Sequence, residues 1–337
     1  MKVRTLLAFL LVSVIAMAQA PVLNYYMPKT EVVVEVSYLK TELEPGMFYQ
    51  YSERYLGVKD AIIEAMTMYE IESVRIFGRT VADKSRMHQV ELTQKTLANM
   101  GLSLNDKGIL EGVNCSAEHP QKKNGSKLEP KHKADNLSVT LPPLLEEQIL
   151  SGSLQRMAES TAKQIYRIRE NRFNLLFGET DHAQMDGGAM RLTLSELAKQ
   201  EEQLTQLFVG KRKTELKRKM FVIDTDEYEP VLFRFSQYEG IVDSDDVSGK
   251  PYEIKVKNVK VSASHGEDKK VVCSPIYFIS AGETTITITE SDNLIAEKTL
   301  IMPQYGYETA LPQELFLKSA PKIEFNVHTG AIRSIKQ

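Results

Sequence analysis

Alternation of apolar and polar residues predicts strands near both ends of the chain. In residues 30–43, TEVVVEVSYLKTEL, the side chains of Val32, Val34 and Val36 recur with period two and fall on one face of an extended segment. Other runs of this kind are bounded by turn sequences such as Asn-Asp-Lys-Gly at 105–108. The remaining predicted strands cover residues 67–77, 87–96, 101–104, 109–113, 252–262, 285–289 and 294–301, with a final hairpin over 323–335.

A period of three to four residues predicts two long helices, over residues 154–176 and 189–209. Because a short connection joins them, we expect the two helices to pack antiparallel. Glu201 lies on the apolar stripe of the second helix, about one turn from the level of Arg169 on the first. We therefore expect an ion pair between the helices. A short helix is also predicted within residues 47–57, where a glycine ends it.

The order of these elements predicts an α+β fold, with mostly antiparallel β-sheet structure and an inserted long antiparallel helical hairpin. Strands come first, the two long helices follow, and strands return at the end. We divide the chain into a signal peptide (1–18), an N-terminal β-rich domain with one short helix and a mobile loop at 117–136 (19–141), the helical hairpin (142–210) and a C-terminal antiparallel β domain (211–337).

The first residues have the three parts of a secretory signal peptide. Lys2 and Arg4 precede an apolar run, and small residues then alternate, which favours cleavage after Ala18. The run of roughly 10 apolar residues is shorter than the roughly 20 that span a bilayer, so we expect export rather than anchoring. We expect no transmembrane segment in the mature chain, and a location in the periplasm or at the cell surface.

The charge balance and the cysteine content limit the classes of partner and cofactor that the chain is expected to bind. Removing residues 1–18 takes away two basic and no acidic side chains, so the formal net charge changes from −3 to −5. This balance argues against nucleic acid as a partner, because nucleic-acid binding depends on neutralising phosphates. Cys115 and Cys273 could form a disulfide in an oxidising compartment or remain free thiols. They are too few for a cysteine-rich metal site, and we expect no cofactor.

The connection between the helices holds four titratable side chains, Glu179, Asp181, His182 and Asp186. One interpretation is a metal site or an acid/base cluster, because these residue types bind metals and carry protons. The other is a polar turn, because turns collect Asp and Gly. Glycoside hydrolysis needs two carboxylates that face each other across a cleft, a geometry that a loop sequence does not specify.

Tyrosines near the mature N-terminus, Tyr49, Tyr51 and Tyr55, are candidate contacts for a partner. Tyrosine suits both sugar stacking and protein interfaces. The alternative interpretation is that these rings pack the short helix onto the first sheet.

Two charged segments also have two interpretations each. Six cations within residues 211–219 could attract lipid phosphates or an acidic partner, or could protect an exposed sheet edge. Asp243, Asp245 and Asp246 could ligate calcium, but their surroundings do not follow the EF-hand pattern, and a solvated β-turn is the alternative.

Sequence signatures of catalysis are missing. The chain has no G-x-S-x-G nucleophile elbow, no H-E-x-x-H zinc motif, no P-loop and no dinucleotide fingerprint, and its six histidines are scattered. We therefore expect a protein that is not an enzyme.

Three stretches together resemble a known family. They are PGMFYQYSERYLGV (45–58), AKQIYRIRENRFNLLFGETDHAQMDGGAM (162–190) with its continuation ELAKQEEQLTQLFVGK (196–211), and MPQYG (302–306). The family comprises exported proteins of roughly this length from Gram-negative anaerobes, catalogued as a domain of unknown function. The resemblance covers most of the mature chain and implies export and a single full-length family unit. It implies no activity and no catalytic residues.

These features favour a non-catalytic exported envelope protein that binds or helps assemble another envelope component. Its partner would be an envelope protein or a glycan, contacted through residues 162–210 and 48–55. The alternative function is a carbohydrate-binding module or a glycan hydrolase, whose site would use the tyrosines and the carboxylates at 179–186.

Overall fold

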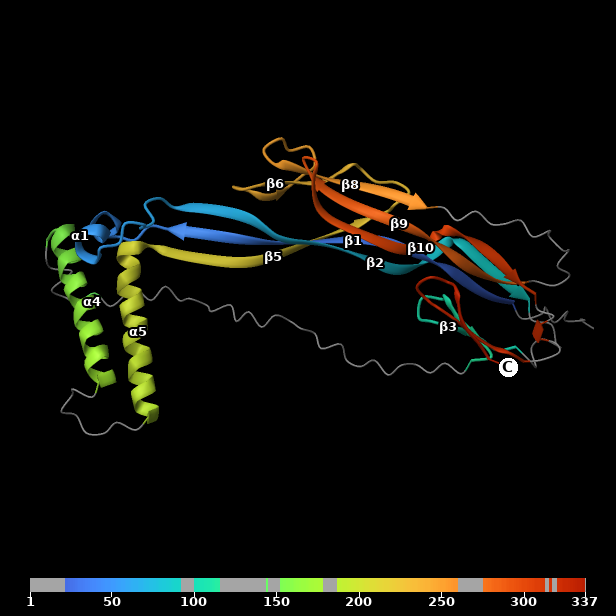
Figure 1. The fold of residues 1–337 in the computed structure, drawn as a ribbon, viewed down its shortest axis with the longest axis horizontal. Coiled ribbons are helices and arrows are strands. Elements are labelled where there is room, and N and C mark those ends of the chain that lie inside the picture. The colour runs from blue at the N-terminus through green and yellow to red at the C-terminus, as the bar shows by residue number, and fades with distance from the viewer. Residues whose placement is uncertain are drawn as a thin grey trace, which may run out of the picture.

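A three-stranded ribbon connects a helical end of the molecule to an end made of β-sheets (Figure 1). The computed structural model describes residues 22–91, 100–115, 144, 152–177, 187–259, 275–312, 315–316 and 320–336. The predicted signal peptide (1–18) and the predicted mobile loop (117–136) lie outside these residues. The molecule is elongated along the ribbon, so its two ends are well separated.

The ribbon has the strand order β2-β1-β5, and both pairs are antiparallel. The strand predicted at 30–43 is confirmed as part of the longer β1. The separation of the strands predicted at 67–77 and 87–96 is wrong, because β2 is continuous over Met66–Glu91; residues 92–96 lie outside the described residues. Its middle, GRTVADKSR, has no apolar alternation, and it stays extended because residues 78–83 pair with β1, with an irregularity before the pairing resumes at Met87. The ribbon strands are β1 (Val22–Glu44), β2 (Met66–Glu91) and β5 (Lys211–Ile223).

The period-two pattern of β1 buries one face of the ribbon. Val32, Val34 and Val36 are fully buried and pack in one core with Ile254 and Ile286 of the neighbouring sheet. Removing these branched side chains from water is the main favourable contribution to the joining of ribbon and sheet.

Two further antiparallel sheets complete the β-structure, with strand orders β10-β9-β8-β6-β7 and β12-β11-β4-β3. The hairpins predicted over 101–113 and 323–335 are confirmed, and the strands predicted at 285–289 and 294–301 are parts of longer strands. The sheets contain β3 (Leu102–Leu104), β4 (Leu110–Val113), β6 (Val231–Ser236), β7 (Gly240–Val242), β8 (Lys250–Val259), β9 (Ile276–Glu290), β10 (Asn293–Leu311), β11 (Lys322–Phe325) and β12 (Ile332–Lys336).

The sheets combine strands from both halves of the chain. β5 pairs with β1, and β11 pairs with β4, so strands from either side of the helical hairpin share two of the three sheets. The α+β class with mostly antiparallel sheets and an inserted helical hairpin is confirmed. The domain boundaries at 141 and 210 stay predictions.

The predicted helices are present at the end of the ribbon. The long helices predicted at 154–176 and 189–209 are confirmed, and they lie side by side across the ribbon's direction (Figure 1). The short helix is also confirmed, and Gly57 ends it in the left-handed conformation with φ of 70°. The helical elements are η1 (Tyr49–Tyr51), α1 (Ser52–Leu56), α4 (Leu154–Phe177) and α5 (Gly187–Val209).

The charged segments have structural explanations. The cations of residues 211–219 lie in β5, an edge strand of the ribbon, as the edge interpretation expects. The Asp246 N–H donates a hydrogen bond to the carbonyl of Asp243 at 3.2 Å, in a turn between β7 and β8.

Cys115 is a free thiol, and Cys273 lies outside the described residues. None of the described helices has the length and apolar character needed to cross a membrane.

Candidate functional site

The helical hairpin joins the ribbon through one residue, Gly210, which lies between the end of α5 and the start of β5. Its φ of +87° is in the region that favours glycine, and its N–H donates to the Gln206 carbonyl at 2.9 Å. A Cβ here would lie 2.4 Å from the carbonyl oxygen of Glu44 on β1. Because the junction is a single residue that packs against β1, the hairpin extends from the ribbon without a linker.

The turn after β1 also holds the hairpin. Phe48 is fully buried and its ring lies 5.2 Å from that of Phe208 on α5, while its N–H donates to the Leu207 carbonyl at 2.7 Å. A Cβ on Gly46 would lie only 2.3 Å from that same carbonyl oxygen, so glycine permits the close approach. Helix and turn therefore form one packed unit at the ribbon's end.

The candidate tyrosines lie at the base of this unit and are half-buried. Tyr51 and Tyr55 pack against the hairpin core, with their ring centroids 6.0 Å apart. The carbonyl of Tyr55 accepts a hydrogen bond from the Tyr166 hydroxyl of α4 at 2.9 Å. Tyr49 accepts one from the Gln50 amide at 3.1 Å. The rings of Tyr51 and Tyr55 pack against helices rather than the first sheet, and the contact of all three tyrosines with a partner stays a prediction.

The predicted ion pair between the helices is confirmed. Arg169 Nε donates to the Glu201 carboxylate at 2.7 Å, and Arg172, which the sequence analysis missed, donates to the other oxygen. Burial raises the pKa of Glu201, but the hydrogen bonds from Arg169 and Arg172 outweigh it and hold that pKa below its usual range. The carboxylate therefore stays charged and fixes the register of the two helices.

The hairpin buries side chains in the half near the ribbon and exposes large apolar ones in the other half. The buried side chains of α4 end at Ile168, and those of α5 begin at Leu204, so all of them lie in the half near the ribbon. Beyond the ion pair, large apolar side chains are open to solvent. We call these the hairpin surface: Phe173 (54% exposed), Leu176 (64%), Phe177 (67%) and Leu192 (65%).

Phe173 and Phe177 stand one helical turn apart with ring centroids separated by 4.4 Å, so they present a joint aromatic face. The candidate residues Glu179, Asp181, His182 and Asp186 follow this face in the chain but lie outside the described residues. The choice between a polar turn and a metal or acid/base cluster there stays open. Among the residues that are described, no group of three or more His, Cys, Asp or Glu side chains could hold a metal ion.

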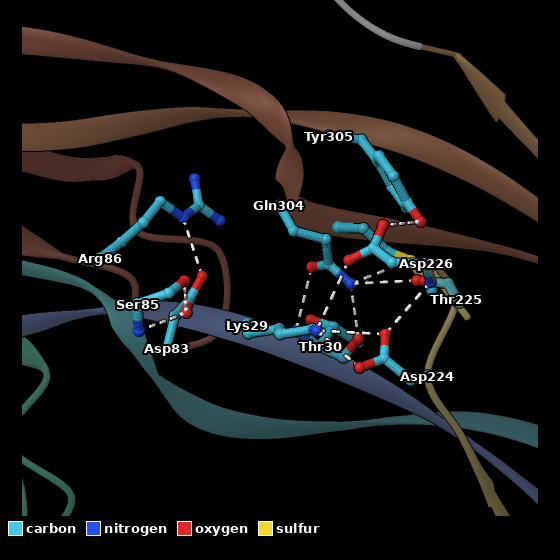
Figure 2. Close-up of polar contacts among 11 residues, drawn as sticks. Lys29, Thr30, Asp83, Ser85, Arg86, Asp224, Thr225, Asp226, Gln304 and Tyr305 are labelled. Carbon is cyan, nitrogen blue, oxygen red and sulfur yellow. Dashed lines mark hydrogen bonds and ion pairs between the residues drawn. The ribbon is translucent and has the colours of Figure 1, made fainter.

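A polar clamp, which the sequence analysis missed, fixes the ribbon to the five-stranded sheet (Figure 2). Gln304 of β10 donates to the Thr30 carbonyl at 2.7 Å and accepts from the Thr30 N–H at 3.1 Å. Lys29 donates to both carboxylate oxygens of Asp224, at 2.9 and 3.1 Å. The Tyr305 hydroxyl donates to Asp226 at 3.0 Å. The MPQYG stretch thus holds together strands that are distant in the sequence.

Fold and site together define an elongated, β-rich protein that carries a rigidly attached helical hairpin at one end. The chain belongs to the family described as Domain of unknown function (DUF4831), whose match spans residues 22–333. No curated protein and no solved structure matches it. The predicted membership of a family of unknown function is confirmed, while export and a Gram-negative anaerobic source stay predictions.

Proposed function

We propose that this chain is a non-catalytic exported protein of the cell envelope that binds or helps assemble another envelope component through its helical hairpin. The observation that carries the proposal is the exposed hairpin surface of Phe173, Leu176, Phe177 and Leu192. Aromatic and large aliphatic side chains that project from a rigid element are the residues that anchor protein interfaces. A protein partner is therefore the component that fits best.

The rest of the hairpin explains why such a surface can be displayed. The buried half of α4 and α5, the turn around Phe48 and the junction at Gly210 hold the helices in place. A partner consequently meets side chains that are already ordered, which reduces the entropy lost on binding. The charged groups of Arg169, Arg172 and Glu201 border the apolar surface and would form its polar rim.

Export is supported by the sequence of residues 1–18, and the proposed envelope location rests on export. The absence of catalytic sequence signatures supports binding rather than chemistry. The alternative, a carbohydrate-binding module or glycan hydrolase, rests on the tyrosines at 49–55 and the carboxylates at 179–186. Changing Glu179, Asp181 and Asp186 singly to alanine in hydrolysis screens tests that alternative directly.

The test is in-cell crosslinking of a tagged chromosomal copy in its native host, followed by mass spectrometry of the captured envelope proteins. The informative variant is Phe173→Ser combined with Phe177→Ser. The matched control is Leu294→Ser on β10, which changes a side chain of similar exposure (62%) in the five-stranded sheet.

We expect a reproducible crosslinked protein with the native chain and the Leu294→Ser control. We expect its loss, by about tenfold or more, with the double serine variant, because 1.4 kcal/mol of lost binding free energy corresponds to a factor of ten. Equal capture by all three proteins would contradict the proposal. Circular dichroism of the purified variants checks that the hairpin remains folded.

A further inference from the structure

A pocket of about 690 Å³ lies between the ribbon and the overlying end of the five-stranded sheet. Figure 1 shows β6 above the ribbon, at the end of that sheet nearer the helices. The volume is within the range of pockets that hold small ligands. None of the residues that the sequence analysis selected as candidate contacts lines this pocket.

Aromatic rings from four separate elements line the pocket. They are Tyr69 of β2, Phe235 of β6, Tyr252 of β8 and Tyr238 of the turn between β6 and β7. Three of these rings are buried or half-buried, but Tyr238 is 67% exposed. The exposed ring of Tyr238 at the rim is available to stack on a ligand.

The polar groups of the pocket converge on one carboxylate. Glu290 lies 3.1 Å from the Lys250 ammonium group and borders the pocket beside Tyr252. Burial and the neighbouring Glu290 raise the pKa of Tyr252 to about 12, so its hydroxyl remains protonated. An ionised carboxylate has about four lone-pair positions, and the contact with Lys250 leaves acceptor capacity for a ligand hydroxyl.

The pocket is already formed. The Tyr69 N–H donates to the Gln237 carbonyl at 2.8 Å, which joins the β6–β7 turn to the edge of the ribbon. Tyr69 also packs against Gly240, where an added Cβ would lie 3.0 Å from the ring. Arg234 donates to the carbonyls of Ser244 and Gly249 and so holds the following loop. A ligand would therefore not have to order these segments.

We propose that this pocket binds a neutral or amino-sugar ring. A sugar ring has apolar C–H faces that stack on aromatic side chains and hydroxyls around its edge that donate to carboxylates, which is the combination that these walls provide. The Lys250–Glu290 pair is internally neutral, and Glu70 adds a negative charge, so the pocket disfavours phosphate and other anions. This site is independent of the hairpin surface.

The test is ligand-observed NMR and calorimetry of the purified protein with maltose, cellobiose, lactose and chitobiose, beside a glucuronic acid disaccharide and trialanine. We expect binding of at least one neutral or amino-sugar disaccharide and weaker binding of the acidic one. The Tyr238→Ala variant should bind about tenfold more weakly, because one stacking surface is lost. Glu290→Gln should also weaken binding several-fold, because the charged acceptor is removed.

Two controls separate this site from the rest of the molecule. Phe177→Ala removes an aromatic ring with the same exposure, 67%, from the hairpin surface, and Glu297→Gln neutralises a carboxylate on β10. Both should bind sugar like the native chain, while Tyr238→Ala should keep the crosslinked partner. Binding of trialanine alone, binding of no disaccharide, or native affinity in Tyr238→Ala would each overturn the proposal.

Discussion

At the scale of single residues, two glycines decide how the hairpin meets the ribbon. Gly46 lets the turn after β1 approach the Leu207 carbonyl, and Gly210 turns the chain from α5 into β5 with a positive φ. Neither position has room for a Cβ. The direction in which the hairpin surface points therefore depends on backbone atoms as much as on buried side chains.

Gly210→Ala should destabilise the protein. The substitution places a side chain in an unfavourable backbone region and 2.4 Å from the Glu44 oxygen, so we expect the free energy of unfolding to fall by about 1–3 kcal/mol. Urea unfolding followed by circular dichroism measures this change. The control is Gly187→Ala at the start of α5, where an added Cβ meets nothing within 4 Å. Equal stability of the two variants would show that the junction is not strained by a side chain.

Residue pairs within the hairpin were partly predictable from sequence. The pair between Arg169 and Glu201 follows from helical spacing and antiparallel packing, and the structure contains it. The second partner, Arg172, was missed because the rotation of one helix about its axis decides which of two neighbouring arginines reaches the same carboxylate.

At the scale of elements, the period of the apolar residues correctly predicted the strands and helices that bury one face. β1 alternates because one of its faces is buried, and the two long helices show their apolar period because they pack on each other. β2 was divided in error because residues 78–83 pair with β1 through backbone groups, which leave no mark on the pattern of side chains. Strand lengths were underestimated for the same reason in β9 and β10.

The lysines of β5 should protect the ribbon from association. β5 is an edge strand whose backbone groups could pair with another chain, and charged side chains discourage such pairing. Replacing Lys213 and Lys217 by alanine should increase aggregation on mild heating, as measured by light scattering. Replacing Lys163 and Lys199 on the helices changes the net charge equally and should have less effect. Similar scattering from both double variants would mean that net charge alone matters.

At the scale of the whole molecule, the clamp around Lys29, Asp224 and Gln304 joins the ribbon to the five-stranded sheet (Figure 2). Its members come from three distant parts of the chain, so no local pattern could have predicted it. The pocket beside Tyr69 and Glu290 could not be predicted from sequence either, because its lining residues come from the ribbon and the five-stranded sheet and are distant in the chain.

We expect the clamp to make the free energy of unfolding depend on pH. The hydrogen bond from Lys29 holds the pKa of Asp224 below its ordinary value of 3.8, so the stabilisation is present above that value and is lost as the pH falls through the lowered one. Asp224→Asn should lower the free energy of unfolding at pH 7 by about 1 kcal/mol at most, because this carboxylate is half-exposed.

The difference between native and Asp224→Asn proteins should shrink as the pH is lowered from about 5 to about 2.5, since protonation removes the same charge. Urea titrations at several pH values measure it. Asp106→Asn, in the turn between β3 and β4, is the control and should show no comparable loss at pH 7. A pH-independent difference for Asp224→Asn would contradict the assignment of this carboxylate to the clamp.

The one-residue junction at Gly210 has a mechanical consequence. A tension applied to the hairpin along the ribbon passes directly into β5, whose thirteen residues pair with β1 from Glu44 to Val32. The ladder bonds lie across the direction of that pull, so they are loaded together in shear rather than opened one after another. The ribbon is thus arranged to resist extension along its length.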